Sequence, residues 1–301
     1  MIVAVAVATV WTSPESPKER DLPALQNPVQ LREWMNPLTI EDRLSFWADN
    51  QTQTQILYGR KVIVDEERGD WAKVIIPDQS CKKDERGYPG WVPKRQLIDA
   101  PEYEHVLTSN PKRAVVSAST AMLYINADEP DMEISFLTSL PLLYTDAQWT
   151  QVLTPHGPRL LKTSEVQVVV GKPSIEGNVG ESIVTTAKRF LNLHYLWGGM
   201  SAFGYDCSGF AHSMHLAHGI VIPRDASDQA QSGKLVEKED LLPGDLLFFA
   251  HEEGKGRVHH VGIYAGDNQM IHSPDSRHAI ELISLAGYKL EKEHCISRRY
   301  W

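Results

Sequence analysis

The sequence is poor in cysteine, and the three cysteines that it has cannot form a disulfide framework. Cys81, Cys207 and Cys295 are an odd number, and no two of them lie close together along the chain. Disulfide-stabilised domains and zinc clusters both need paired or closely spaced cysteines. The sequence therefore predicts neither, and a reducing cytoplasm is the expected compartment.

The apolar start of the sequence lacks two features of a signal peptide or membrane anchor. No basic residue precedes Met1–Val10, and the segment is too short to span a bilayer. Valine and threonine alternate with alanine along it, which favours a β-strand. A cytoplasmic location is expected, and secretion or attachment to the cell wall is the alternative if a leader has been removed from a precursor.

The sequence also has fewer basic than acidic residues. The 30 Lys and Arg residues face 39 Asp and Glu residues, giving a formal net charge of −9. Nucleic acids and anionic membranes are bound by clustered Lys and Arg, so neither is an expected partner. A small ligand fits the charge better, and we expect a monomer. The hydrophobic share of 42% and the charged share of 23% are close to those of globular proteins, which indicates a soluble, folded chain.

The 301 residues are enough for two or three domains. Prolines and polar residues gather near Ala100–Glu102 and near Gly171–Pro173, as they do at domain boundaries. These positions predict three domains, at residues 1–102, 103–172 and 173–301.

The first two regions have the short strand-like segments of small β-barrels. In the first region these segments are 61–64 and 71–76. Residues 21–48, which precede them, have the apolar spacing of a helical insertion. The second region repeats the short-strand pattern at 114–116, 142–144, 149–153 and 166–169. Two small barrels are therefore expected.

The third region has a different order of elements. Glu181–Leu193 has the pattern of an amphipathic helix, 210–218 can form a second helix that ends at Gly219, and apolar strands follow at 245–273. Helices followed by strands indicate an α+β domain.

The segment around Cys207 carries the strongest chemical signal. Glycines at 198, 199 and 209 permit close backbone approach, and Cys207 falls where the second helix begins. The N–H groups and positive dipole end at a helix start favour thiolate over thiol, and they can hold an oxyanion. Cys207 is therefore a candidate nucleophile. The alternative is a buried cysteine that serves only as a small apolar residue.

A nucleophilic cysteine needs a base, and Arg257–Ser273 offers one. Its two apolar strands flank a Gly-Asp-Asn turn, which predicts an antiparallel hairpin. His260 and His272 share a face of this hairpin only if the turn has an odd number of residues or if a bulge intervenes. His260 would then accept the thiol proton while His272 orients its ring. His259 is the competitor on the opposite face, and each histidine has the alternative of a structural role.

His212, His215 and His218 also attract notice, because their spacing resembles that of metal ligands. Residues three apart rotate steadily around a helix rather than converging on one point. We expect no metal site there.

Several motifs occur together in the order found in one family. The stretches concerned are Asp206–Phe210, Pro223–Asp225, Leu242–Leu246, His260–Tyr264 and the single residue His272. Together they resemble the NlpC-type cysteine peptidases, papain-like enzymes that cut peptidoglycan stem peptides. The resemblance covers roughly residues 175–301. It implies a papain-like fold of helices packed on an antiparallel sheet, a catalytic Cys207, His260 and His272, no metal and no cofactor. It also selects His260 over His259.

The first two regions carry a resemblance of their own. Gly69–Val74 and Gly90–Pro93 are similar to bacterial SH3-like barrels, and Trp149–Val152 with Gly157–Val168 is a weaker match. Two such barrels before the catalytic domain resemble the subgroup that acts on free cell-wall peptides. That resemblance implies hydrolysis of the γ-D-glutamyl bond to meso-diaminopimelate or lysine, with release of L-alanyl-D-glutamate.

The resemblance to this subgroup also implies a set of substrate-binding residues. In the subgroup the first barrel helps to recognise a free N-terminal alanine, and the residues that match its pocket are Tyr88, Tyr195, Asp206, Ser208 and Asp225. An acidic residue such as Asp225 suits a buried ammonium, which needs a carboxylate to offset desolvation. The sequence departs from the subgroup at Gln53, where a glutamate often stands, and this departure weakens the expectation of strict amino-terminal selectivity.

Three alternatives remain open from the sequence. The enzyme could attack intact peptidoglycan with its barrels as wall anchors, or it could be a non-catalytic peptide-binding module. Acyl transfer is the third alternative, because transferase and hydrolase differ only in which nucleophile reaches the thioester.

Overall fold

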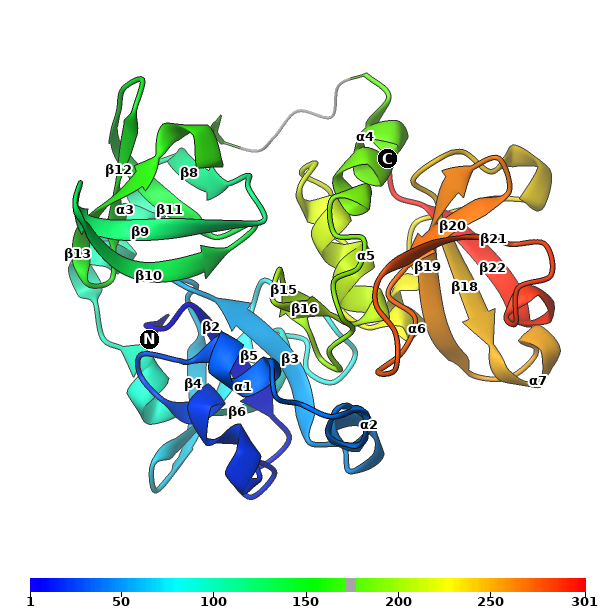
Figure 1. Ribbon diagram of the computed structural model, residues 1–301, viewed down its shortest axis with the longest axis horizontal. Coiled ribbons are helices and arrows are strands. Elements are labelled where there is room, and N and C mark those ends of the chain that lie inside the picture. Colours follow the sequence, from blue (N-terminus) through cyan, green and yellow to red (C-terminus); the bar gives the residue numbers. More distant parts are fainter. Residues whose placement is uncertain (172–176) are drawn as a thin grey trace. The chain divides into compact units, whose positions relative to one another are not determined.

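The computed structural model describes residues 1–171 and 177–301, and the chain forms two compact units (Figure 1). The first unit consists of Met1–Asp78, Tyr88–Pro173 and Ser201–Phe203, and the second of Gln79–Gly87, Ser174–Met200 and Gly204–Trp301. The division into three domains stays a prediction, and its second boundary, between residues 172 and 173, lies outside the described residues. Within the described residues, no helix has both the length and the apolar character needed to span a membrane.

One sheet of the first unit lies in the predicted first barrel. It is antiparallel with the order β3-β2-β6-β5-β4, and its strands are β2 (Val7–Trp11), β3 (Thr52–Leu57), β4 (Ile63–Arg68), β5 (Trp71–Ile76) and β6 (Tyr88–Pro93). The apolar start of the chain forms two strands rather than one. β1 (Ile2–Val3) pairs with β7 (Leu97–Ile98), and β2 pairs with β3 and β6.

The predicted helical insertion is present between β2 and β3. It comprises the 3-10 helix η1 (Glu19–Leu25) and the helices α1 (Leu31–Met35) and α2 (Ile40–Ala48). Trp34 of α1 fixes this insertion, because its ring packs on Trp11 and Phe46 and its indole N–H donates to Asp21 Oδ1 at 2.8 Å. These tryptophans belong to the core of the unit.

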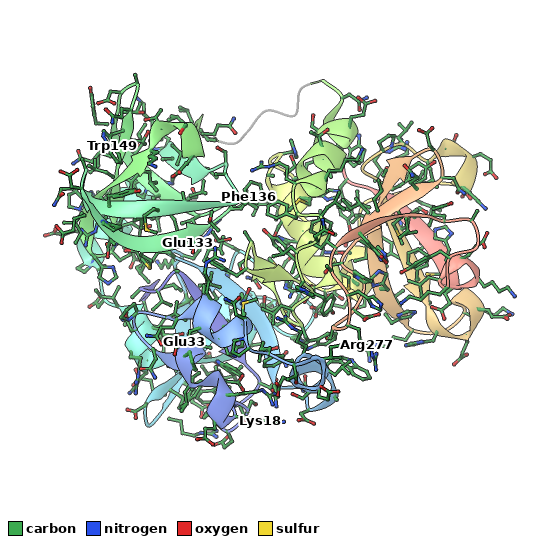
Figure 2. The ribbon with its side chains drawn as sticks, in the orientation of Figure 1. Lys18, Glu33, Glu133, Phe136, Trp149 and Arg277 are labelled. Carbon is green, nitrogen blue, oxygen red and sulfur yellow. The ribbon has the colours of Figure 1, made fainter. Side chains whose placement is uncertain are left out.

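The largest sheet of this unit follows helix α3 (Pro101–Ser109). Its order is β10-β9-β13-β12-β11-β8-β14, with the strands β8 (Lys112–Val116), β9 (Thr120–Asn126), β10 (Glu129–Ser135), β11 (Ser139–Thr145), β12 (Trp149–Thr154), β13 (Gly157–Lys162) and β14 (Val166–Val170). All four strand segments expected from the sequence are strands. Trp149, labelled in Figure 2, packs edge-on against Tyr124 with ring centroids 5.3 Å apart.

The second unit contains an antiparallel sheet with the order β17-β22-β18-β19-β20-β21. Its strands are β17 (Lys234–Leu235), β18 (Leu246–Ala250), β19 (Val258–Gly266), β20 (Gln269–His272), β21 (Glu281–Ser284) and β22 (His294–Arg299). The helices α4 (Val179–Lys188), α5 (Cys207–Leu216) and α6 (Ala226–Gln229) contact β19, a central strand of this sheet (Figure 1). The expected α+β class, with helices packed on an antiparallel sheet, is confirmed.

Helix α4 is shorter than the sequence pattern predicts, since it ends at Lys188 rather than at Leu193. The backbone beyond it pairs with Ile280 instead: the Asn192 N–H donates to the Ile280 carbonyl and the Ile280 N–H donates to the Leu193 carbonyl. Asn192 adopts a positive φ of 69° at the point where the chain turns away. A long-range backbone pairing thus replaces the last helical turn.

Candidate active site

Cys207 is the first residue of α5, as the sequence predicts, and it is half-buried. Asp206 caps the helix, because its carboxylate accepts the Gly209 N–H at 2.6 Å. Gly209 packs against the chain so closely that an added Cβ would lie 2.1 Å from the carbonyl oxygen of Gly199. Only glycine allows this approach, which holds the start of α5 against the preceding glycine-rich turn.

The structure does not favour the thiolate that the helix start predicts for Cys207. Burial raises the pKa of the Cys207 thiol to about 12, and the neighbouring Asp206 charge adds to the effect. Backbone N–H groups of Val261 and Ser208 act in the opposite direction, as does Arg224. Desolvation therefore outweighs the helix start, and the sulfur retains its proton until a base accepts it. The contact with Val261 also places the sulfur beside β19, next in sequence to His260.

His260 and His272 lie on one face of the predicted hairpin, formed by β19 and β20. The turn between the strands has two residues, Asp267 and Asn268, both with positive φ, so the turn alone would put the histidines on opposite faces. A register shift between Tyr264 and Gly266 restores the shared face. The rings then meet, with His260 Nε2 2.8 Å from His272 Nδ1.

Two further residues, which the sequence motifs do not identify, extend this pair. Glu281 lies directly opposite His272 in the register of β20 and β21, and its Oε1 is 3.2 Å from His272 Nε2. The Tyr288 hydroxyl donates to the same carboxylate oxygen at 3.1 Å. The residue opposite His272 could have been sought in the strand at 281–284. It cannot be identified from the sequence, because the pairing partner of this strand is not known until the chain has folded.

The hydrogen-bond directions follow from this chain of groups. Glu281 accepts from His272 Nε2, so His272 Nδ1 is free to accept from His260 Nε2. The remaining nitrogen of His260, Nδ1, is then an acceptor and can take the thiol proton. Burial lowers the pKa of His260 well below its usual value and lowers that of His272 to about 4, so both rings are neutral at neutral pH.

His259 points to different partners. Its Nε2 lies 2.8 Å from Glu293 Oε2, and its ring stacks on His251 with centroids 4.1 Å apart. It therefore takes part in a separate contact on the other side of β19. This is the arrangement expected of adjacent strand residues.

His215 and His218, at the end of α5 and just beyond it, also have separate surroundings. His215 Nδ1 lies 2.8 Å from the Ala211 carbonyl oxygen, and His218 Nε2 lies 3.0 Å from Thr186 Oγ1. Across the described part of the chain, no three His, Cys, Asp or Glu side chains come together in a way that could hold a metal ion.

Asp206 and Ser208 contact a buried arginine, Arg224, which is not among the predicted site residues. Arg224 is 1% exposed, and its two terminal nitrogens donate to Asp206 Oδ2 at 2.6 Å and Oδ1 at 3.1 Å. The same guanidinium donates to Ser208 Oγ at 2.9 Å. Arg224 thus holds the residues on both sides of Cys207. Asp206 and Ser208 thus have a structural role through Arg224. Their substrate-binding roles stay predictions.

We expect Arg224→Met to lower both stability and turnover. The substitution leaves the Asp206 carboxylate buried without its ion-pair partner, which costs about 3–5 kcal/mol of unfolding free energy. It also loosens the start of α5, so kcat should fall. Urea unfolding and kcat measured on hydrolysis of a cell-wall tripeptide, at a temperature where the variant is folded, test this expectation.

Arg299→Met is the matched control, because Arg299 forms a comparable bidentate pair with the fully buried Asp245. It should destabilise the protein without lowering kcat. Equal kcat in the two variants would contradict a positioning role for Arg224. Arg224→Lys keeps the charge and provides a second variant if Arg224→Met does not fold.

Tyr195 and Asp225 belong to the same unit as Cys207, whereas Tyr88 and Gln53 belong to the other. Tyr195 is buried, and burial raises the pKa of its hydroxyl. The nearby charges of Cys207 and Asp206 raise this pKa further. Tyr88 begins β6 and is 2% exposed, and the Gln53 amide donates to Thr12 Oγ1 at 2.7 Å. The substrate-binding roles of Tyr88, Tyr195 and Asp225 stay predictions.

Comparisons with known proteins cover almost the whole chain. Residues 192–299 match the NlpC/P60 family, and residues 116–168 match the YKFC SH3b2 domain. The sequence is 44% identical over 297 residues to a γ-D-glutamyl-L-lysine dipeptidyl-peptidase of Bacillus subtilis (strain 168), covering 99% of this chain and 97% of the relative. A protein of the same description from Bacillus cereus (strain ATCC 10987 / NRS 248) is 40% identical over 301 residues, covering 99% of this chain and 90% of that relative.

A solved structure shows the same similarity in three dimensions. The crystal structure of an NlpC/P60 family protein from Bacillus cereus ATCC 10987 matches with a TM-score of 0.95 at 39% identity. The match covers 99% of this chain and 98% of that one.

Proposed function

The chain belongs to the NlpC/P60 family of cysteine peptidases, and on this basis we propose that it hydrolyses the γ-D-glutamyl bond to a diamino acid in peptidoglycan stem peptides. The substrate is a free peptide with an N-terminal L-alanine, and the products are L-alanyl-D-glutamate and the diamino-acid fragment. The observation that carries this proposal is the 44% identity to a γ-D-glutamyl-L-lysine dipeptidyl-peptidase, which extends over both structural units.

The geometry of the second unit supports a general-base mechanism. As the Cys207 sulfur attacks the γ-glutamyl carbonyl carbon, its proton passes to His260 Nδ1. A helix start offers backbone N–H groups that can stabilise the developing oxyanion, and α5 begins at Cys207 itself. The imidazolium then protonates the departing amine, the C–N bond breaks, and a thioester remains on Cys207.

The second half of the reaction uses the same base. Neutral His260 removes a proton from water, the hydroxyl adds to the thioester carbonyl, and the thiol is restored as the dipeptide acid leaves. His272 and Glu281 hold the His260 ring in one tautomer and stabilise its charge while it carries the extra proton.

The amino end of the substrate is assigned to Asp225. The side chain of Asp225 is 30% exposed, and the residue directly follows Arg224, which holds the start of α5. A carboxylate in this position suits an ammonium group. Gln53, which stands where the subgroup often has a glutamate, carries no negative charge. We therefore assign recognition of the ammonium to Asp225 alone.

The experiment that tests the proposal compares three substrates. The tripeptides L-Ala-γ-D-Glu-L-Lys and L-Ala-γ-D-Glu-meso-diaminopimelate and polymeric peptidoglycan are incubated with the enzyme, and the products are identified by mass spectrometry. We expect L-alanyl-D-glutamate from at least one tripeptide, at a higher rate than any release from the polymer. Faster release from the polymer would overturn the assignment to free peptides, and cleavage at another bond would overturn the reaction.

A further inference from the structure

A loop from the first barrel region belongs to the second unit. Residues 79–87 connect β5 to β6 along the chain, yet they cluster with the second unit. Two backbone contacts attach this 79–87 loop to the segment around α6. The Arg224 N–H donates to the Ser80 carbonyl at 3.0 Å, and the Lys82 N–H donates to Asp228 Oδ2 at 2.9 Å. The loop is thus held beside the segment that contains Asp225.

The attachment brings an ammonium group to Asp225. Lys83 Nζ lies 3.8 Å from Asp225 Oδ2, with 43% of the lysine side chain and 30% of the aspartate side chain exposed. Burial lowers the pKa of Lys83, while the Asp225 charge raises it. Asp225 begins α6 as its N-cap residue, but its side chain makes no capping hydrogen bond. The Asp225 carboxylate is therefore partly neutralised by a lysine of the same chain.

We propose that Lys83 is a specificity-determining residue that weakens the preference of this enzyme for peptides with a free amino terminus. The inference rests on the proposed function, in which Asp225 receives the substrate ammonium. Lys83 Nζ already lies near this carboxylate. A substrate ammonium that binds Asp225 is therefore repelled by the positive charge of Lys83. A peptide whose alanine nitrogen is acylated carries no charge there, so Lys83 does not disfavour it.

The size of the effect follows from the exposure of the pair. Partly exposed ion pairs contribute little to free energy because water screens them. Removal of the Lys83 charge should therefore lower KM for the free-amine peptide by about three- to fivefold and leave kcat unchanged. KM for an acylated peptide should not change.

The test measures kcat and KM for L-Ala-γ-D-Glu-L-Lys and for its Nα-acetyl form, in the unmodified full-length enzyme and in Lys83→Met. Lys82→Met is the matched control, since Lys82 is the adjacent lysine of the same loop but its Nζ lies 3.6 Å from Asp228 Oδ1 and contacts Gln231. It should leave the ratio of the two KM values as in the unmodified enzyme.

The possible outcomes separate the inference from the proposed function. A fall in KM for the free-amine peptide alone, seen in Lys83→Met and not in Lys82→Met, supports the inference. An unchanged KM, an equal change for both peptides or a rise for the free amine overturns it while the proposed function stands. Absence of dipeptide release by the unmodified enzyme overturns the proposed function, and this inference with it.

Discussion

Replacing Cys207 with alanine is expected to lower kcat for dipeptide release by at least about 10⁴-fold, because no other group can form the thioester. The alanine removes only the sulfur atom from a half-buried position, so the fold should persist. Product analysis by mass spectrometry measures the loss, and thermal unfolding confirms that the variant is folded.

Cys295→Ala is the control for this substitution. Cys295 is exposed in the second unit, and its thiol donates to the Phe248 carbonyl at 3.3 Å. Its removal should leave kcat unchanged. Substantial dipeptide release by folded Cys207→Ala would refute the assigned nucleophile.

His260→Ala is expected to reduce kcat by about 10³-fold or more, because the thiol then loses the group that accepts its proton. The requirement is strict in this protein, since burial holds the pKa of Cys207 at about 12 and the sulfur cannot ionise alone at neutral pH. Steady-state kinetics on the free tripeptide measure the effect.

His259→Ala provides the matched comparison, because His259 is the adjacent histidine of the same strand. Its ring contacts Glu293 and His251 rather than His272. This variant should retain kcat within about threefold, as for a residue outside the reacting groups. Comparable losses in the two variants would mean that the base has been assigned to the wrong histidine or is not used.

His260 and His272 show which features of the hairpin can be predicted from the sequence. Two apolar strands around Gly-Asp-Asn predict the hairpin, and the structure contains it. The face shared by His260 and His272 depends on a single register shift near Gly266. A one-residue change in register moves every side chain to the opposite face, so strand composition alone leaves the question open. The resemblance to the family is what selects His260 from the sequence.

The sequence by itself determined the features that depend on neighbours a few residues apart. These are the helix that begins near Cys207, the short strands of the barrel regions and the α+β order of the last region. Capping, periodicity and turn chemistry act over single turns or strand pairs, which is why they can be recognised locally.

Only the tertiary structure decided which distant groups meet. It buried Arg224 against Asp206, placed Glu281 behind His272 and brought Lys83 from a barrel loop to Asp225. It also reversed the expected ionisation of Cys207, because desolvation depends on everything that packs around the sulfur. Burial and long-range register are properties of the assembled fold, and no local pattern in the sequence encodes them.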